Sequence, residues 1–370
     1  MELKVDRADF SRSISRIQGI VERKNTMPVL ANCLIKADKE GIALMATDLD
    51  ITIIDRCSAK VKKIGSVSLN ARKLHEIFRE LEEGEVEFKE IEATKVELKA
   101  SHFTCDLQGI NPDEFPVLPT VEGFQFFEIE AGILSEMISK TIYAAATEEG
   151  RFTLNGIFME KLGEDELLRF VATDGHRMAA IDRQVQVIKE MQLPAGVILP
   201  KKGMVELQRL VSGIEGKVSL GVKENHIAIK IGDTLLFMRL VDGEFPEYKR
   251  VIPENNPITA RLGRDDFLKS LRRTSVLVDE KARAVKLIFS KGKMVIESSN
   301  PSYGIAKGES ECEYEGNPLE IGFNDRYLYE ILTTISEGKV KMEIKDELSP
   351  VLFTVDSDTK YQCVVMPMRI

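Results

Sequence analysis

Apolar residues spaced three or four positions apart mark one face of a helix near the start of the chain. Phe10, Ile14, Ile17 and Val21 follow this spacing. The same period returns in five later segments, so the pattern predicts six amphipathic helices. They cover residues 7–24, 71–81, 133–143, 202–211, 265–276 and 325–335.

Segments in which apolar and polar residues alternate follow the predicted helices. This period of two is typical of strands that bury one face. The predicted strands cover residues 30–36, 42–46, 51–55, 85–88, 95–100, 217–222, 226–231, 285–289, 293–297, 339–344 and 351–355. Strands that follow one another with few crossovers favour antiparallel sheets. We therefore expect an α+β fold in which the helices lie on one face of the sheets.

The chain repeats itself three times. Ala46-Thr47-Asp48, Ala172-Thr173-Asp174 and Ser298-Ser299-Asn300 are close copies, each 126 residues from the next. A second marker follows each copy, as Gly84-Glu85-Val86, Gly216-Lys217-Val218 and Gly338-Lys339-Val340. Proline, glycine and acidic residues cluster at 119–123 and 253–257. We therefore expect three similar domains, 1–122, 123–253 and 254–370, each with two helices.

The composition is that of an ordinary globular protein, with 370 residues that are 43% hydrophobic and 30% charged. No apolar run approaches the roughly 18 residues that span a bilayer, and the first residues do not form a signal peptide. The five cysteines are widely spaced, without a Cys-x-x-Cys pair. We expect a cytoplasmic protein with no membrane segment, whose cysteines are small core residues.

Positive charge is concentrated on the predicted helices. The net charge is −9, yet the helical segments taken as 7–24, 71–80, 132–146, 201–211, 263–275 and 324–333 together carry a surplus of seven positive charges, so the strands and loops are strongly acidic. If the helices share one surface, that surface would attract a phosphate backbone without sequence preference. Two alternatives stay open: these basic residues are merely solvated, or the chain is a peptide-binding scaffold that never meets DNA.

The segment 173–176 is the strongest candidate for an enzyme site. No second histidine lies at metal-binding spacing from His176. The chain also lacks a phosphate-binding loop and a nucleophile elbow. In the other copies Asp174 becomes Asp48 and Asn300, and His176 becomes Asp50 or Ser302. A turn that repeats in shape but not in chemistry is typical of a scaffold, so we expect no catalytic residue, metal or cofactor.

Four motifs carry a specific resemblance. They are Val171-Ala172-Thr173-Asp174-Gly175-His176-Arg177, Leu154-Asn155-Gly156, the segment 240–248 and the tail 364–370. With these motifs and the threefold plan, the whole chain closely resembles the bacterial DNA polymerase III beta subunit family, the replicative sliding clamps. The resemblance implies a DNA clamp fold of three similar domains, each with two helices backed by antiparallel sheets. It further implies a homodimer that closes head to tail into a ring around double-stranded DNA, and a processivity factor rather than an enzyme.

The resemblance also implies an apolar groove between the second and third domains. In the family this groove binds short peptides of the DNA polymerase III alpha subunit, the delta subunit of the clamp loader and other clamp-motif proteins of replication and repair. The matching positions are Leu154, Thr173, Gly175, His176, Arg177, Met178, Pro246, Arg250, Val251, Asn324, Tyr327, Leu348, Val364, Val365, Met366, Pro367, Met368 and Arg369.

Two further sets of residues come from the resemblance. The expected DNA contacts are Lys24, Arg72, Phe152, Lys201 and Lys202, and the expected dimer interface comprises Leu107, Ile110, Val276 and Leu277. Two positions depart from the family pattern. Thr153 stands where some members have a tyrosine, and Ala282 stands where some have a phenylalanine at the rim of the groove.

Overall fold

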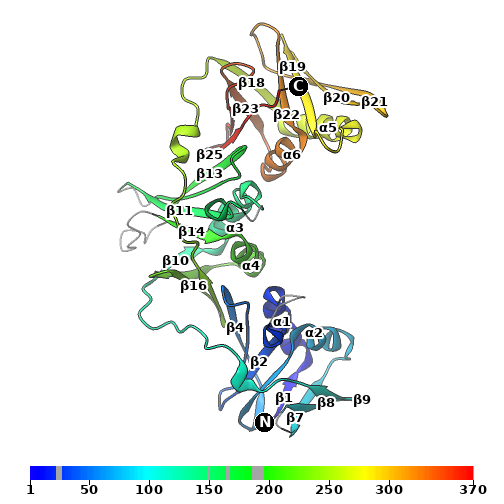
Figure 1. The fold of residues 1–370 in the computed structure, drawn as a ribbon, viewed down its shortest axis with the longest axis vertical. Helices are drawn as coiled ribbons and strands as arrows, with labels where there is room; N and C mark the ends of the chain where they lie inside the picture. The colour runs from blue at the N-terminus through cyan, green and yellow to red at the C-terminus, as the bar shows by residue number, and fades with distance from the viewer. Residues whose placement is uncertain (22–26, 93, 148–149, 164–166, 186–195, 370) are drawn as a thin grey trace. The chain divides into compact units, whose positions relative to one another are not determined.

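The computed structural model describes residues 1–21, 27–92, 94–147, 150–163, 167–185 and 196–369. Within these residues it contains six α-helices and four antiparallel sheets, which confirms the predicted α+β class (Figure 1). The chain divides into two compact units. The first comprises residues 1–132 and 205–240, and the second comprises residues 133–204 and 241–370.

The first unit contains two sheets. The smaller has the order β5-β1-β7-β8-β9, with strands Lys60–Lys63, Glu2–Asp6, Glu85–Glu92, Lys95–Ala100 and Phe103–Gln108. The larger has the order β10-β15-β16-β17-β4-β3-β2-β6, with strands Phe126–Glu130, Lys217–Lys223, His226–Ile231, Thr234–Arg239, Ile51–Cys57, Ile42–Thr47, Asn32–Ala37 and Gly65–Asn70. The helices of this unit are α1 (Arg7–Ile17), α2 (Ala71–Glu80) and the short 3-10 helices η1 (Gln18–Ile20), η2 (Pro28–Ala31) and η3 (Pro112–Glu114).

The second unit also contains two sheets. One has the order β14-β11-β12-β13-β25-β24-β23-β18, with strands Val197–Pro200, Gly156–Leu162, Leu167–Thr173, Arg177–Gln184, Asp358–Val365, Val351–Val355, Lys339–Ile344 and Ile258–Gly263. The other has the order β21-β20-β19-β22, with strands Gly304–Glu311, Lys293–Asn300, Ala284–Ser290 and Leu319–Asn324. Its helices are α5 (Arg264–Thr274), α6 (Asp325–Thr334), η4 (Ile142–Ala144), η5 (Phe152–Leu154), η7 (Tyr248–Val251) and η8 (Ser275–Leu277). The helices α3 (Ala131–Ser139) and α4 (Lys201–Val211) pass from one unit to the other.

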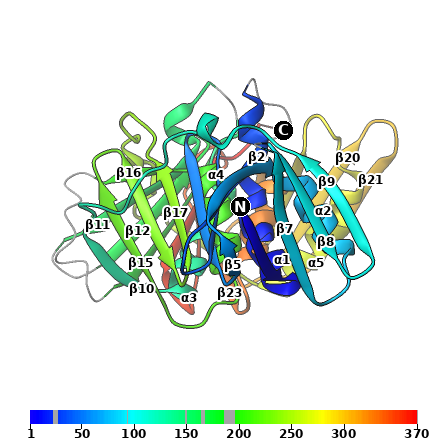
Figure 2. The same ribbon diagram turned by 90° about the horizontal axis from the view of Figure 1, so that it is seen from below.

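The helices form where the sequence supplies a cap and an apolar face. Asp6 accepts hydrogen bonds from the first turn of α1, and Asn70 caps α2 in the same way. Phe10 of α1 is fully buried, with its ring 4.2 Å from Phe78 of α2 and 5.2 Å from Phe88 of β7. Figure 2 shows α1 and α2 beside the strands β7 to β9. Burying each ring contributes about 2–3 kcal/mol, so this cluster fixes the helix pair on the sheet.

All six predicted helices are confirmed, with ends that differ by a few residues. The predicted helix 265–276 is α5 followed by η8, and the predicted helix 133–143 is α3 followed by η4. Residues 22–24 of the first predicted helix lie outside the described residues. The extensions are 3-10 turns, in which the last helical carbonyls find tighter partners.

The glycine of the second sequence marker has a structural role in each repeat. It takes a positive φ at Gly84, Gly216 and Gly338, where φ is 138°, 96° and 98°. Its carbonyl accepts the N–H of the first helical residue of its repeat. These bonds are Arg7 to Gly84 (2.9 Å), Ala131 to Gly216 (2.8 Å) and Arg264 to Gly338 (3.0 Å). Since the bond is the same in each repeat, it aligns α1, α3 and α5 residue by residue.

Two sheets run across the boundaries between repeats. In the first unit β17 of the second repeat pairs antiparallel with β4 of the first, and we call this pairing the first joint. In the second unit β25 of the third repeat pairs with β13 of the second, and we call this the second joint. Each of the four sheets has two end strands among the described residues, and β9 and β21 are two of them (Figure 1). In its repeat β9 has the place of β17 and β25, and β21 has the place of β4 and β13. The predicted domain limits stay a prediction, since each joint bonds two repeats into one sheet.

Candidate functional site

The turn between β12 and β13 is held by its own side chains. The Asp174 carboxylate accepts hydrogen bonds from the backbone N–H groups of His176 (2.9 Å) and Arg177 (3.0 Å). Gly175 has a φ of 89°, in the left-handed region that favours glycine. In the first repeat the Asp48 carboxylate accepts equivalent bonds from two backbone N–H groups. The repeated aspartate therefore builds a turn, as the scaffold interpretation expects.

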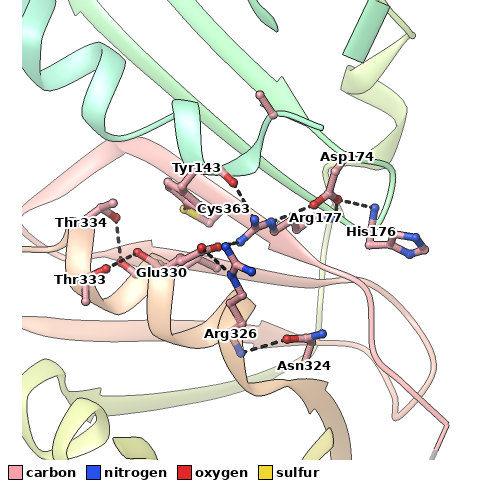
Figure 3. A network of polar contacts seen from close by, with 12 residues as sticks. Tyr143, Asp174, His176, Arg177, Asn324, Arg326, Glu330, Thr333, Thr334 and Cys363 are labelled. Atoms are coloured by element: carbon pink, nitrogen blue, oxygen red, sulfur yellow. Dashed lines mark hydrogen bonds and ion pairs between the residues drawn. The ribbon is translucent and has the colours of Figure 1, made fainter. Parts of the chain in front are cut away.

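Arg177 is the centre of a buried polar network in the second unit (Figure 3). Its side chain is 8% exposed and forms ion pairs with Asp174 (3.0 Å) and Glu330, while a third N–H donates to the Tyr143 carbonyl (2.6 Å). Its guanidinium lies 5.3 Å from the ring of Tyr143 and 4.4 Å from that of Tyr327. Burial lowers the pKa of Arg177, but Glu330 and Asp174 raise it by more, so this side chain stays charged. Arg177 thus ties α6 to the turn.

A second polar cluster lies next to this network. The Tyr143 hydroxyl is 3.0 Å from the Tyr361 hydroxyl and 3.2 Å from the Cys363 sulfur, and Thr334 bonds Tyr361 at 2.8 Å. Burial raises the pKa of the Cys363 thiol to about 11. The thiol is therefore protonated at neutral pH and acts as a packing group. The cluster connects η4, β25 and α6 within the second unit.

The C-terminal tail is bonded along its length. Val364 and Val365 are buried in β25. The Met366 N–H then donates to the His176 carbonyl (2.9 Å), and the Met368 N–H donates to the Gly322 carbonyl of β22 (2.8 Å). The side chain of Met366 is 37% exposed. The tail therefore bonds the turn through Met366 and the edge of β22 through Met368, and the Met366 side chain is partly exposed.

A buried cluster of aromatic and aliphatic side chains includes Val364, close to the start of this tail. Met178 and Val364 belong to a buried group that also includes Tyr248, and Phe158 and Phe245 pack against that group. The rings of Phe158 and Phe245 are stacked, with centroids 4.9 Å apart. Exposed apolar side chains on the segments that carry the remaining predicted positions are Val251 at 42% and Leu348 at 56%.

The predicted groove residues fall into two kinds. Met178, Arg177, Val364 and Val365 are buried, so they support the surface rather than form it. The other positions are exposed or half-buried: Leu154, Thr173, Gly175, His176, Pro246, Arg250, Val251, Asn324, Tyr327, Leu348, Met366, Pro367, Met368 and Arg369. All of them belong to the second unit. Their role in partner binding stays a prediction.

The predicted DNA contacts differ in how far their side chains are available. Phe152 is 71% exposed. The Lys201 ammonium instead donates to the carbonyls of Ala145 (2.7 Å) and Ala146, and burial lowers its pKa. Arg72 donates to the Val21 carbonyl (3.2 Å). Lys202 also has an interaction partner, and Lys24 lies outside the described residues.

The predicted interface residues lie next to the two end strands. Leu107 is a half-buried residue of β9, and Val276 is a 78% exposed residue of η8, which packs against β21. Leu277 is half-buried in the same turn. Ile110 forms a bridge with Ser68 and packs against a core cluster of its own repeat. Val276 and Leu107 are therefore the better placed of these residues to meet another chain.

No group of three or more metal-ligating side chains occurs in the described part of the chain. None of the described helices is long and apolar enough to cross a membrane.

Three family models cover nearly the whole chain in order. They describe the N-terminal, central and C-terminal domains of the DNA polymerase III beta subunit and match residues 1–119, 128–247 and 249–369. The chain belongs to the DNA polymerase III beta subunit family. Members of this sliding clamp family are processivity factors without catalytic activity, so the chain is a sliding clamp and not an enzyme.

Curated relatives and solved structures agree with the sliding clamp family. The chain is 33% identical to the beta sliding clamp of Caulobacter vibrioides and 32% identical to that of Pseudomonas aeruginosa, with each pair covered completely. A crystal structure of the Bartonella birtlesii sliding clamp bound to griselimycin superposes with a TM-score of 0.95 at 34% identity, covering both chains completely. A Caulobacter crescentus clamp superposes with a TM-score of 0.94 at 33% identity, covering 100% of this chain and 99% of that one. The three-domain clamp fold expected from the sequence is confirmed.

One residue beside the candidate sliding clamp groove escaped the sequence analysis. Arg151 donates from Nη1 to the Asp174 carbonyl at 2.8 Å. A β-carbon built on Gly175 would lie 2.8 Å from the same nitrogen. The space that Gly175 leaves open is therefore occupied by the Arg151 guanidinium. The one signal in the sequence is that Arg151 lies three residues before Leu154 of a motif. The contact with Asp174 depends on how two distant loops meet, and no sequence pattern records that.

Proposed function

We propose that the chain forms a head-to-tail homodimeric ring in the cytoplasm, encircles duplex DNA and tethers the DNA polymerase III alpha subunit for processive synthesis. The observation that carries the proposal is the strand pairing at the two joints. Both joints pair the last strand of one repeat with the fourth strand of the preceding repeat. The same two kinds of strand end the sheets at β9 and β21. A second copy therefore offers each end strand the neighbour that its counterparts already have.

We call the proposed pairing of β21 of one copy with β9 of the partner subunit the third joint. Residues that lie opposite one another across neighbouring strands form rows, and these rows give the register of the third joint. At the first joint the row is Ala46, Ile53, Leu236, Ile229 and Leu220. At the second joint it is Ala172, Ala179, Cys363, Phe353 and Met342. All ten residues are buried. The two incomplete rows are Ser298 with Ala306, and Cys105 with Leu98 and Phe88. Ala306 of one copy then lies opposite Cys105 of the partner subunit.

Side-chain size supports this register. The register places Gly304 opposite the partner's Leu107 and Gly308 opposite the partner's Phe103. Each large side chain therefore faces a glycine. Phe103 on β9 is 40% exposed, and Ile305 on β21 is 61% exposed. Exposed apolar residues on two end strands are typical of an interface. Because the contact joins two different surfaces, two identical third joints close a dimer into a ring.

The helices support a loose hold on DNA. Several of their cations are neutralised by neighbours, as in the pairs Arg12–Asp9 and Arg326–Glu330. Contacts of this kind attract phosphates weakly and read no bases. A closed ring holds DNA through its topology and needs no tight contact, which leaves it able to slide. Ring closure then keeps a bound polymerase at the primer end through effective concentration.

We further propose that the surface around Val251, Leu348 and Met366 binds extended peptides from the polymerase alpha subunit, the delta subunit of the clamp loader and other clamp-motif proteins. Val251 follows Arg250 in the chain, and the Met366 N–H donates to the His176 carbonyl, so polar residues adjoin the apolar ones. Methionine adapts to different sequences, which suits a surface shared by several partners.

A cysteine at position 306 tests the ring. In Ala306→Cys the new thiol would lie opposite Cys105 of the partner subunit, at the roughly 4.5–5.5 Å Cβ separation of facing residues. Oxidation, or a short bismaleimide linker, should therefore join two chains. A closed ring gives covalent dimers only, whereas an open head-to-tail filament gives a ladder of higher oligomers.

The matched control is Lys307→Cys. Its side chain lies on the same strand but on the other sheet face, so it should not react with Cys105. Cys33, Cys57, Cys312 and Cys363 are buried and should not compete. Equal crosslinking of both variants, or none in either, would contradict the proposed joint.

A further inference from the structure

A glutamate recurs at the same position of the second helix in each repeat. It is Glu76 in α2, Glu206 in α4 and Glu330 in α6, in each case five residues after the helix begins. The side chains of Glu206 and Glu330 are 12% and 21% exposed, whereas that of Glu76 is 55% exposed. Two copies of this residue are therefore shielded, and the third is not.

The two shielded glutamates lie at the joints. In the first unit a β-carbon on Gly19 would lie 2.6 Å from the Glu206 carboxylate, and Arg209 donates to the Ser15 carbonyl at 3.1 Å and to that of Arg16. The end of α1 thus packs directly on α4. In the second unit Glu330 pairs with Arg177, which in turn donates to the carbonyl of Tyr143.

The aligned helices identify the surface that Glu76 lacks. Because Arg7, Ala131 and Arg264 are equivalent first residues, Gly19 corresponds to Tyr143 and to Val276. Glu206 lies next to Gly19, and Glu330 is connected to Tyr143 through Arg177. Glu76 should accordingly lie next to Val276 of another copy, and Val276 is 78% exposed.

In the same alignment a basic residue stands three positions before Gly19, Tyr143 and Val276. It is Arg16, Lys140 and Arg273. Arg16 pairs with Asp55 at 3.2 Å, and Lys140 pairs with Asp358 at 2.9 Å. Both carboxylates belong to strands of a joint: Asp55 lies opposite Thr234 in the first, and Asp358 begins β25 in the second. A cation at this helix position is thus neutralised where two repeats meet.

Arg273 pairs with no such carboxylate in the described part of its own chain. The residue of the third repeat that corresponds to Asp55 is Gly308, and Arg273 is exposed and forms no ion pair within the described residues. In its own helix Glu76 has only Lys73, at 2.6 Å on the surface. Such an exposed pair contributes little and is easily exchanged.

We propose that Arg273 of one copy forms an ion pair with Glu76 of the partner subunit, so that the third joint is completed by a carboxylate supplied from the other chain. This inference rests on the ring proposed above. Because salt screens an ion pair between solvent-accessible charges, raised salt would weaken this pair and favour opening of the ring at the third joint.

A charge-swap cycle tests the pair. Arg273→Glu and Glu76→Arg should each raise the dimer dissociation constant by about tenfold or more, because like charges then face each other. The double variant should return the constant to within about threefold of the wild type, since the pair is restored in reverse. Analytical ultracentrifugation at low and moderate salt measures all four proteins, and thermal unfolding checks that each one folds.

Two controls carry the same charge changes away from the predicted contact. Lys269→Glu lies one turn earlier on α5, and Glu83→Lys lies on the exposed loop after α2. Neither should change the dissociation constant by more than about twofold. If the two single effects simply add in the double variant, the pair does not exist.

The outcomes also separate this inference from the ring itself. A wild-type chain that stays monomeric would overturn the ring and the pair together. A dimer whose dissociation constant ignores Arg273→Glu overturns the pair alone. If that variant instead loses retention on DNA while its dimer is unchanged, Arg273 faces DNA and the assignment to the joint is wrong.

Discussion

At Arg177 a guanidinium is held away from water between two carboxylates, a backbone carbonyl and two aromatic rings. The attraction between such a buried cation and its carboxylates adds little net stability. Removing the cation costs more, because it leaves the carboxylates shielded from water and unpaired. Asp174 and Glu330 are 17% and 21% exposed, so neither could recover full hydration in place.

We therefore predict that Arg177→Met destabilises the protein by about 3 kcal/mol, because it leaves the shielded Asp174 carboxylate without its cation and Glu330 with only the exposed Arg326. Urea unfolding measures the loss. The matched control is Arg250→Met, whose side chain is 82% exposed and pairs with Glu247 on the surface. It should change stability by less than about 0.5 kcal/mol. Equal effects in the two variants would show that the Arg177 network is not stabilising.

The sequence identified the basic residues of the helices, but not which of their side chains are free to contact DNA. Lys201 was predicted to contact DNA, yet its ammonium donates to the Ala145 carbonyl. A lysine that ends on a backbone carbonyl looks the same in a sequence as one that ends in water. The difference depends on how the chain before η5 passes over the start of α4, and no local pattern records that approach.

At the scale of elements, the tail has two counterparts within the chain. The segment after the last strand of each repeat turns back and bonds the edge strand of its own repeat. Ile110 bridges Ser68, the Val241 N–H donates to the Ile198 carbonyl, and Met368 bridges Gly322. The first two segments continue as linkers into the next repeat. The tail thus makes the same kind of contact as the start of each linker, which accounts for its apolar residues.

Deletion of residues 366–370 should abolish binding of the polymerase alpha subunit and the clamp loader while leaving the dimer intact. The deletion removes Met366 from the candidate groove and the Met368 bond from β22, but it touches neither β9 nor β21. Pull-down with each partner measures binding, and sedimentation measures the dimer. Hydrogen exchange should rise in Leu319–Asn324, whose edge loses its cover. A deletion that dissociates the dimer would contradict the assignment of these elements.

The elements were predictable because amphipathic periods are local. All six helices were found, and the alternating segment after each glycine marker is a strand, β7, β15 or β23. The joints were not found, since β4 and β17 are more than 170 residues apart and their alternation is the same as that of any paired strand. The pairing partner of a strand is a property of the assembled repeats, which only the structure supplies.

At the scale of the whole molecule, the proposed ring would depend on both charge and topology. The net charge of −9 should repel DNA from most of the surface, while the helices carry a positive surplus that is partly neutralised by ion pairs such as Arg209–Glu206. Adhesion of this strength would be lost as salt rises, because it depends on released counterions. Retention by a closed ring would not, since it requires only that the two third joints stay shut.

This difference predicts how the protein behaves on circular and linear DNA. Loaded by its clamp loader onto a nicked circle, the wild type should stay bound through gel filtration at salt concentrations that strip electrostatically bound proteins. One restriction cut should release it, because the ring slides off the new ends. Oxidised Ala306→Cys rings should fail to load, and should load again after reduction. Equal loss from circular and linear DNA would mean that adhesion, not encirclement, holds the protein, and would return the peptide-binding scaffold as the better account.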